Sequence, residues 1–342
     1  MTSIFTDSAD IVRNLKTSAA GALCSRFPFL ISLRRPPIVV VEASNICSLA
    51  CPLCETVNSM QRPKGVMRIE TFKRMLSQVS PFVRRMQFSF AGEPLMNENL
   101  CSMVEMATQK NISCKVDTNG VFLEKYARQL VDSGLQRINV ALNGVDQETL
   151  SFYRKNSDFN AVVAGAKKLI EYRNKKNKAF PKAHMQFIVT KNNEDRLDEA
   201  VRLASNIGFD VIEFKSLSIC LGDWIDDEKR SLAADLYLPE NQEFLRYKTE
   251  NGKWVLNSNL NRFCADIFTS AVVLWNGDVV LCCMDVEGKY KSGNILNEHF
   301  LKIWRCGTMN KLRSAILKKE LPICKNCSLT SGHIQRVKLA ED

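Results

Sequence analysis

The sequence predicts an α/β fold in which parallel strands curl into a barrel or part of one. Between residues 38 and 214, six short apolar segments alternate with longer segments whose apolar residues have helical spacing. Strand–helix units of this kind favour a parallel sheet covered by helices. Because their crossovers are right-handed, the loops that follow the strands should all lie at one rim of the sheet.

Proline and glycine residues at the ends of these segments support the assignment. The helix expected at 69–79 stops before Pro81, and a helix that runs to about 109 follows Pro94. Helices ending near 133 and 207 are closed by Gly134 and Gly208, because glycine accepts the left-handed conformation that ends many helices. Two further helical stretches separate the fourth strand from the fifth. The predicted strands are residues 38–41, 86–90, 112–116, 137–142, 184–189 and 211–214.

A smaller α+β unit is expected after the barrel. Residues 271–282 read as two strands joined by an Asn276-Gly277 turn, which is typical of a β-hairpin, and helices are expected at 295–304 and 310–317. Before the barrel, helically spaced apolar residues end at Pro36-Pro37. The expected organisation is a leader helix at 1–36, the barrel at 37–220, a linker at 221–258, the smaller domain at 259–330 and a tail at 331–342.

Composition narrows the class of protein. Among 342 residues 45% are hydrophobic, and no apolar run reaches the 18 or more residues of a membrane span. The N-terminus lacks the basic start of a secretory signal, since Asp7 and Asp10 precede its first Arg. Thirteen cysteines, spaced like metal ligands rather than a disulfide framework, indicate a reducing cytoplasm.

The net charge of +10 is spread over the chain and reads first as a solvated surface. No basic stripe interleaved with aromatic residues is present, which argues against nucleic-acid binding. Two functional interpretations of the charge remain open. The substrate can be a small anionic molecule, or an acidic electron donor such as flavodoxin or ferredoxin can dock on the protein.

Three cysteines in the loop after the first strand are the most informative feature. Cys47, Cys51 and Cys54 can hold three irons of a four-iron, four-sulfur cube and leave the fourth iron open to an exogenous molecule. The alternative is a zinc site. Structural zinc prefers four protein ligands, and neither a His nor a fourth Cys lies close by in the sequence.

The spacing C-x3-C-x2-C directly after a short apolar strand resembles that of the radical S-adenosylmethionine (SAM) enzymes. The resemblance implies a partial (β/α)6 TIM-like barrel. It also implies that the amino and carboxylate groups of SAM chelate the open iron, and that an electron from the cluster then releases a 5′-deoxyadenosyl radical. The polar loops expected at the same rim, each following a strand, agree with this resemblance.

The same resemblance assigns candidate residues to the SAM site. Ala91-Gly92-Glu93-Pro94 is similar to the family's G-G-E motif, in which glycine lets the backbone approach the cofactor; read alone, it is a strand-ending turn. Arg154 suits the cofactor carboxylate, with a surface salt bridge as the alternative. The segment 139–144 aligns with a Ser-x-Asp strand end in which Ala141 replaces Ser. The cofactor candidates are Gly92, Glu93, Asn119, Asn143, Arg154, Thr190 and Asn192.

A second set of cysteines falls in the smaller domain. Cys264, Cys282, Cys324 and Cys327 can complete one [4Fe–4S] cube with no open iron, although four cysteines with a C-x-x-C suit a zinc ribbon equally well. The hairpin, with Gly277 five residues before Cys282, resembles the twitch extension, a shortened SPASM domain. No cysteine follows Cys327, so the resemblance implies one auxiliary cluster and two [4Fe–4S] clusters in all.

A fully ligated second cluster favours electron transfer. The cysteine layout is similar to that of the twitch-domain alcohol dehydrogenase of aminoglycoside biosynthesis, which implies oxidation of an alcohol in a sugar- or cyclitol-like small molecule. One alternative is a radical epimerase in which Cys220, Cys283 or Cys306 returns a hydrogen atom. A second is a peptide-modifying, thioether-forming enzyme. Outside this class stands a zinc-binding interaction protein.

Overall fold

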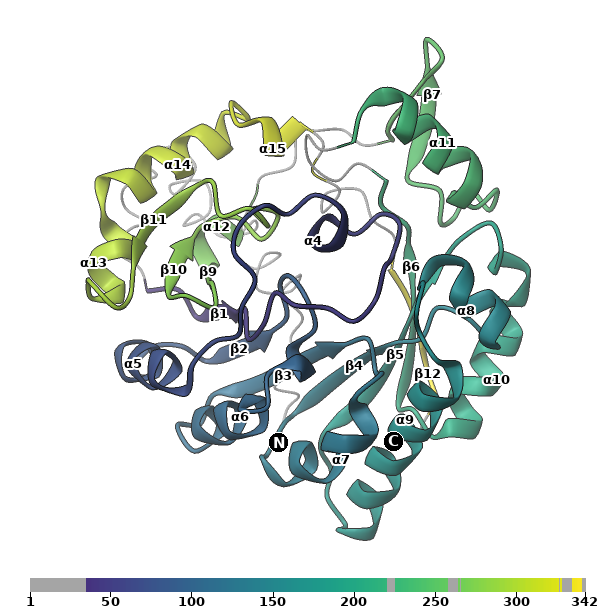
Figure 1. Cartoon of the computed structure of the whole chain (residues 1–342), viewed down its shortest axis with the longest axis horizontal. Coiled ribbons are helices and arrows are strands. Elements are labelled where there is room, and N and C mark those ends of the chain that lie inside the picture. The colour runs from purple at the N-terminus through teal and green to yellow at the C-terminus, as the bar shows by residue number, and fades with distance from the viewer. Residues whose placement is uncertain are drawn as a thin grey trace, which may run out of the picture.

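The computed structural model describes residues 35–219, 225–257, 264, 266–325, 327 and 334–339. Its main sheet has ten strands in the order β11-β10-β9-β1-β2-β3-β4-β5-β6-β12 and curves into an open barrel (Figure 1). The six predicted strands are present and run parallel to one another, which confirms the partial barrel. They are β1 (Ile38–Val41), β2 (Arg85–Phe88), β3 (Ser113–Thr118), β4 (Arg137–Ala141), β5 (Lys182–Val189) and β6 (Val211–Ser216).

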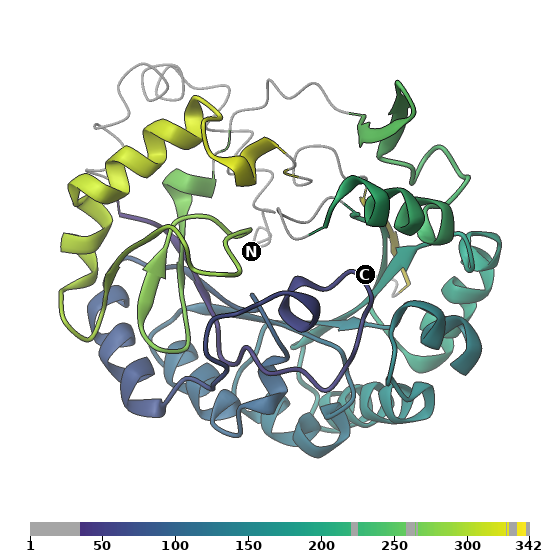
Figure 2. The same cartoon turned by 45° about the horizontal axis from the view of Figure 1, so that its top comes forward.

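Helices cover the outer face of this sheet, while the loop that follows β1 crosses its open end (Figures 1 and 2). Gly208 takes the left-handed conformation that ends α10, as its place in the sequence predicted. The elements of the barrel are α4 (Glu55–Asn58), α5 (Ile69–Val79), η1 (Pro94–Met96), α6 (Leu100–Thr108), α7 (Leu123–Asp132), α8 (Gln147–Tyr153), α9 (Phe159–Lys175), η2 (Glu194–Arg196) and α10 (Leu197–Ile207).

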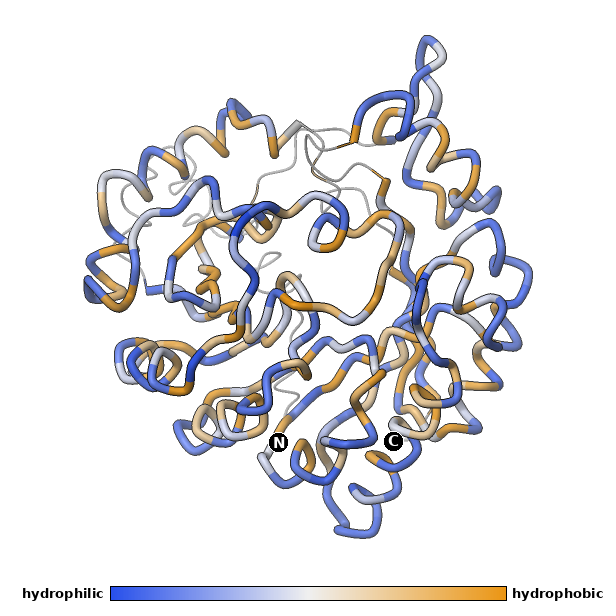
Figure 3. Tube along the Cα trace, in the orientation of Figure 1, coloured by the Kyte–Doolittle hydropathy of each residue, from blue (hydrophilic) through white to orange (hydrophobic). Residues whose placement is uncertain are grey.

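The alternation of residues along the strands gives the sheet two different faces. In β3, Cys114 and Val116 are buried against the helices and belong to the main hydrophobic core. Lys115 and Asp117, one residue away, face the interior of the barrel and are half-buried. The surrounding helices are amphipathic: Figure 3 shows that hydrophobic and hydrophilic residues alternate along their turns. On β3 the outer face is therefore part of the apolar core and the inner face is polar, whereas Val40, Val272 and Val280 form a separate apolar cluster at the β1, β9 and β10 side of the sheet.

The smaller domain continues the same sheet. β9 (Ser270–Val273) pairs in parallel with β1, and β10 (Asp278–Val280) turns back antiparallel to β9, which confirms the predicted hairpin. Gly277 adopts a φ of +89° in the turn, a conformation that glycine accepts without strain. The remaining elements are β11 (Lys291–Asn294), α12 (Asp266–Thr269), α13 (Phe300–Arg305), α14 (Gly307–Leu317) and α15 (Pro322–Lys325).

Three segments differ from the expectation. The helix predicted at 295–304 begins only at Phe300, because β11 and a turn precede it and His299 caps its first amide groups. Residues expected as a linker contain α11 (Asp227–Tyr237), which packs on Leu53 of the cysteine loop, and the hairpin of β7 (Tyr247–Glu250) and β8 (Lys253–Leu256). The expected tail contains β12 (Ile334–Lys338), antiparallel to β6. The expected leader helix, apart from residues 35 and 36, lies outside the described residues.

Candidate functional site

The loop after β1 holds the first three cysteines at the open end of the sheet. Cys47, Cys51 and Cys54 lie between β1 and the short helix α4 (Figure 1). The side-chain amide of Asn58 donates to the backbone oxygens of Cys51 (2.9 Å) and Cys54 (2.8 Å) and so fixes the turn between them. At the base of the loop, Asn45 Oδ1 accepts a hydrogen bond from the backbone amide of Gly65 (2.7 Å). Hydrogen bonds within the loop therefore hold both the cysteine turn and the base of the loop.

The surroundings of the thiols suit sulfur atoms bound to iron. The backbone amide of Leu49 and the side-chain amide of Asn119 donate to Cys47 Sγ at 3.4 and 3.7 Å, and such bonds tune a cluster's potential. Burial raises the pKa of Cys47 and of Cys51, although the nearby Arg154 guanidinium opposes the rise at Cys51. These thiols therefore keep their protons until a cation displaces them, and cluster binding releases protons.

Gly92 allows the loop after β2 to lie directly against the cysteine loop. Its φ is +70°, and a Cβ atom there would lie 2.6 Å from the backbone of Asn45. The neighbouring amide of Glu93 donates to the Ile46 carbonyl at 2.8 Å. Only glycine fits this contact between two backbones, which agrees with the resemblance to the G-G-E motif.

Substitution of Gly92 by Ala is expected to lower the free energy of unfolding by at least about 2 kcal/mol, because the Cβ meets backbone that cannot move aside. Denaturant unfolding of the apo protein measures this loss. Gly252→Ala is the matched control, since Gly252 has a φ of +71° and a Cβ placed there would meet no atom within 4 Å. It should cost about 1 kcal/mol. Equal losses in the two variants would contradict the close contact.

The Glu93 carboxylate joins the loops after β2 and β3. Its oxygens accept hydrogen bonds from Thr118 Oγ1 (2.6 Å), the Asn119 amide (2.7 Å) and the Leu95 amide (3.0 Å). Burial raises the pKa of Glu93, and these hydrogen bonds oppose the rise. The carboxylate is thus a structural acceptor within the protein. Glu93 is 2% exposed, so its carboxylate ties the two loops together from within the protein.

Three of the other candidate residues carry buried polar atoms without a partner. Within the described part of the chain, Arg154 Nε, Asn143 Nδ2 and Asn192 Oδ1 have no hydrogen-bond partner. Buried polar atoms of this kind are rare unless a ligand or water satisfies them. The side-chain amides of Asn143 and Asn192 suit the ribose hydroxyls of SAM, and the Arg154 guanidinium suits its carboxylate. The residues present therefore fit the cofactor.

Asn193 fixes the geometry of this group and was not predicted. Its side-chain amide donates to the carbonyl of Asn143 (3.0 Å), and its Oδ1 accepts the amide of Thr190 (2.8 Å). The predicted Thr190 and Asn143 are both buried. Asn193 therefore ties the loops after β4 and β5 together. Sequence spacing gives no signal for such a contact, because it joins residues 50 positions apart.

The barrel interior below the cysteine loop holds a polar group centred on Asp117. Its carboxylate accepts from Asn139 Nδ2 (2.5 Å) and Gln87 Nε2 (3.2 Å), and Lys115 Nζ lies 3.1 Å away. Burial works to raise the pKa of Asp117, but the charges of Lys115 and Lys215 outweigh it, and the pKa is lowered. Asp117 is thus an ionised carboxylate inside the barrel. The signal that was overlooked is the polar residue at every second position of β3.

Lys215 on β6 is a second charged residue of this interior whose pKa is shifted. Burial lowers its pKa, against the opposing pull of Glu213 and Asp117. Its Nζ lies 3.4 Å from Glu213, whose carboxylate also meets Arg137 (2.7 Å), Arg336 (2.9 Å) and His184 (3.4 Å). Burial opposes ionisation of Glu213, but the hydrogen bond from His184 and the charge of Lys215 hold its pKa well below the usual range. Lys215 therefore shares the Glu213 carboxylate with Arg137, Arg336 and His184.

The second set of cysteines gathers beside the hairpin. Cys264 precedes α12, Cys282 follows β10, Cys324 lies in α15 and Cys327 follows it. Cys264 interacts electrostatically with Cys282 and Cys327, so the thiols share one neighbourhood. Burial raises the pKa of Cys264 to about 12 and that of Cys324 to about 11. As in the first site, these groups need a cation to lose their protons, and their number suits a closed four-thiolate cluster.

The three candidate hydrogen donors have different positions. Cys283 donates to Cys282, and this hydrogen bond raises the pKa of Cys283 well above its usual value. Cys306 caps α14, where its Sγ accepts the Met309 amide at 3.3 Å. Cys220 lies outside the described residues. Cys306 therefore has a structural role in the helix, and Cys283 belongs to the second cysteine site.

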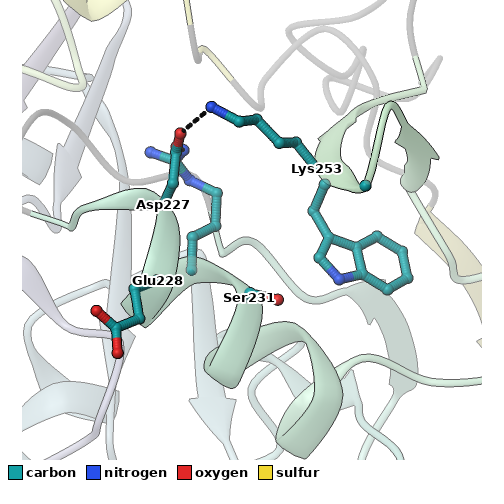
Figure 4. Close-up of a pocket in the computed structure, with 7 residues that line it drawn as sticks. Asp227, Glu228, Ser231 and Lys253 are labelled. Carbon is teal, nitrogen blue, oxygen red and sulfur yellow. Dashed lines mark hydrogen bonds and ion pairs between the residues drawn. The ribbon is translucent and has the colours of Figure 1, made fainter.

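A surface pocket between α11 and the β7–β8 hairpin is a separate feature, and no predicted site residue lines it. Figure 4 shows Lys253 reaching across it to Asp227, with Nζ and Oδ2 2.8 Å apart. Both side chains are more than half exposed, at 68% and 58%. A pair so well solvated contributes little binding energy. The candidate site therefore remains the open end of the barrel.

Two family models match the chain. Residues 41–204 match the radical SAM superfamily, and residues 264–328 match an iron–sulfur cluster-binding domain, SPASM. The first range contains Cys47, Cys51 and Cys54, and the second contains the four later cysteines. Both descriptions imply iron–sulfur clusters, a [4Fe–4S] cluster with SAM in the first and an auxiliary centre in the second.

Known proteins resemble this chain at low identity, one over most of its length and another over about half of it. The Pyrococcus furiosus tungsten-containing aldehyde ferredoxin oxidoreductase cofactor-modifying protein is 22% identical over 84% of this chain and 86% of its own length. A probable GTP 3′,8-cyclase of Methanocaldococcus jannaschii is 26% identical over 51% of this chain. Only 57% of that cyclase is covered.

Solved structures share the fold. BtrN in complex with AdoMet and 2-DOIA superposes with a TM-score of 0.53 at 21% identity, covering 86% of this chain and 94% of BtrN. Streptococcus suis SuiB bound to the precursor peptide SuiA gives 0.62 at 14% identity, covering 96% and 82%. No helix within the described ranges is long and apolar enough to cross a membrane. The two family models show that the chain belongs to the radical SAM superfamily over residues 41–204 and carries a C-terminal domain of the SPASM type over residues 264–328.

Proposed function

We propose that the chain is a radical SAM oxidoreductase that converts an alcohol of a sugar- or cyclitol-like small molecule into a carbonyl. The observation that carries the proposal is the polar interior of the barrel, where Asp117 on β3 and Lys215 on β6 lie close enough to interact electrostatically. Such an interior suits a compact molecule rich in hydroxyl groups. Oxidation of the alcohol removes one hydrogen atom, one proton and one electron from the substrate.

The cofactors have assigned places in this proposal. Cys47, Cys51 and Cys54 hold the cluster that SAM joins, and the seven loop residues from Gly92 to Asn192 named above hold SAM itself. Cys264, Cys282, Cys324 and Cys327 hold the auxiliary [4Fe–4S] cluster. When bound, these groups supply hydrogen-atom abstraction and an electron acceptor. What remains for the chain's own side chains is to hold the substrate and to remove its proton.

Lys215 takes the hydroxyl proton in this scheme. Burial lowers the pKa of its ammonium group, so the neutral amine is more accessible near neutral pH than for an exposed lysine. A base whose pKa lies near the working pH transfers protons most efficiently. Asp117, kept ionised by Lys115, accepts a hydrogen bond from a neighbouring substrate hydroxyl and orients the ring. The cationic excess also favours an anionic substrate.

Product analysis tests the reaction type. With a panel of sugars, amino-cyclitols and their phosphate esters, the reconstituted enzyme should form one 5′-deoxyadenosine per carbonyl product and incorporate no solvent deuterium. Incorporation of one deuterium at an inverted carbon, with no carbonyl, would instead establish an epimerase with a thiol donor such as Cys283. Loss of that deuterium in Cys283→Ala, with Cys306→Ala as a comparison, would identify the donor.

Peptide modification is a second candidate function. It is supported by the fold shared with SuiB, which is described with a bound precursor peptide and covers 96% of this chain. A peptide substrate would need the open end of the barrel rather than its interior. Lys215→Met would then leave peptide turnover unchanged, whereas it should suppress alcohol oxidation.

Metal analysis separates these enzymes from a zinc-binding interaction protein. After anaerobic reconstitution, about eight iron and eight sulfide per chain, without zinc, are expected for two four-iron clusters. About four iron with one zinc would make the C-terminal site structural and favour a redox-neutral reaction. The proposal also places the protein in the reducing cytoplasm, where flavodoxin or ferredoxin supplies the electron for SAM.

A further inference from the structure

The loop that carries the first three cysteines is fastened to the loop that follows Cys282. Arg62, near the end of the first loop, forms a bidentate ion pair with Glu42, one contact being 2.8 Å between Nη1 and Oε2. Its Nε donates to the carbonyl of Val286 at 2.5 Å. Val286 lies four residues beyond Cys282. A single guanidinium therefore joins β1, the first cysteine loop and the second.

The backbone reinforces this connection. The amides of Gln61 and Arg62 donate to the two carboxylate oxygens of Glu287, at 2.8 and 3.3 Å. These contacts join residues more than 220 positions apart in the sequence. Glu287 thus acts as an acceptor for one segment of the first loop, in the way that a carboxylate caps the start of a helix.

Trp275, in the turn of the hairpin, closes the same junction from a third side. Its backbone amide donates to Glu42 Oε2 at 3.1 Å, and its indole Nε1 donates to the Pro63 carbonyl at 3.3 Å. The six-membered part of the indole lies so close to Gly65 that a Cβ there would approach it to 2.8 Å. The residues Glu42, Arg62, Gly65, Trp275 and Glu287, with the Val286 carbonyl, are called the interloop clamp below.

Burial makes the clamp sensitive to the loss of either charge. The Glu42 side chain is fully buried and that of Arg62 is 11% exposed. Burial raises the pKa of Glu42, and the charge and hydrogen bonds of Arg62 oppose that rise. Removal of the guanidinium would leave the buried Glu42 carboxylate without its cation. Either the first loop would then have to shift, or Glu42 would have to take up a proton.

We propose that Arg62 is a positioning residue that couples the two cluster sites, so that filling the auxiliary site favours SAM binding at the first. The auxiliary cluster orders the segment after Cys282, Val286 and Glu287 of that segment hold Arg62, and Arg62 holds the first loop. Coupling of this kind is reciprocal, because the two binding events share one free energy. The proposal goes beyond alcohol oxidation and holds for any reaction that the enzyme performs.

Arg62→Ala is expected to weaken SAM binding by roughly tenfold while the protein keeps the iron and sulfide of both clusters, a coupling within the range of known linked sites. Equilibrium dialysis of the anaerobically reconstituted full chain gives the Kd for SAM. The EPR spectrum of the reduced first cluster, with and without SAM, reports the same binding without turnover. Arg62→Lys should recover only part of the affinity, because an ammonium cannot bridge Glu42 and Val286 as a fork does.

The matched control is Arg74→Ala. Arg74 on α5 also joins the barrel to the smaller domain, since its Nε donates to the Ile295 carbonyl at 2.9 Å, but it touches neither cysteine loop. The Kd of Arg74→Ala for SAM should stay within twofold of that of the parent protein. Glu287→Ala removes two acceptors without stranding a buried charge and should weaken SAM binding by about threefold. Glu287→Ala replaces Arg62→Ala in the experiment if Arg62→Ala does not fold.

A double-mutant cycle decides the matter. Cys324→Ala, which removes the auxiliary cluster, should weaken SAM binding by roughly tenfold in the parent and by less than twofold in Arg62→Ala or Glu287→Ala. An equal loss of SAM affinity in parent and clamp variants would overturn the proposal. So would an unchanged Kd in Arg62→Ala, or a loss in Arg74→Ala as large as in Arg62→Ala. None of these readouts depends on the substrate, so failure of the proposed oxidation leaves them standing.

Discussion

Alanine at Cys51 is expected to abolish reductive cleavage of SAM and to halve the iron and sulfide content, from about eight of each to about four. Cys51 is the middle ligand candidate of the first loop and is buried at 8% exposure. Two remaining thiols cannot hold a cube that already lacks a fourth protein ligand. The measurements are iron and sulfide per chain and 5′-deoxyadenosine formed with dithionite.

The control for this variant is Cys101→Ala. Cys101 lies in α6, half-buried against the hydrophobic core, and burial raises the pKa of its thiol to about 12. Its replacement should leave iron, sulfide and SAM cleavage unchanged. Full iron content in Cys51→Ala, or equal losses in both variants, would remove the first loop from the cluster assignment.

Methionine at Lys215 is expected to lower carbonyl formation by roughly 10²- to 10⁴-fold, the usual contribution of a general base. SAM affinity and iron content should not change, because Lys215 lies on β6 inside the barrel and the cysteine loop does not depend on it. The measurements are kcat for the carbonyl product, the Kd for SAM and iron per chain. Lys168→Met is the control, since Lys168 is exposed on α9 and pairs with Glu124.

The pH dependence provides a second readout of the same residue. Only the neutral amine of Lys215 accepts a proton, so the rate of the parent enzyme should rise with pH through the lowered pKa of this group. Lys215→Met should lose that rising limb. A parent enzyme whose rate falls or stays level over this range would show that another group takes the proton.

The fold was predictable because its periodicities are local. Apolar residues at helical spacing in 69–79 and the Asn276-Gly277 turn each report on a few neighbouring residues, and both are found where expected. The start of α13 was misplaced, because apolar residues continue from Ile295 through a turn that only the contacts of Asn294 define. The strand β12 has an alternating pattern too short and too exposed to distinguish it from a tail.

The candidate site was predictable to the extent that chemistry follows spacing. The cysteines and Gly92 stand at distances that a motif can encode, and the structure places them at the open end of the barrel or beside the hairpin. Lys215 and Arg62 could not be found this way. The importance of Arg62 comes from contacts 224 positions away, and that of Lys215 from burial beside residues of other strands. Such contacts exist only once the chain has folded.

The antiparallel strand β12 bears on the order in which the protein is made. It covers the edge of β6, and Arg336 within it reaches Glu213, a residue synthesised 123 positions earlier. On the other side of the six parallel strands, the edge of β1 stays open until β9, more than 220 positions later, is made and pairs with it. A growing chain therefore leaves the ribosome with two open sheet edges, which invite aggregation until β9 and β12 dock. Slow release, or a chaperone that shields these edges, should raise the yield of protein able to take up its clusters.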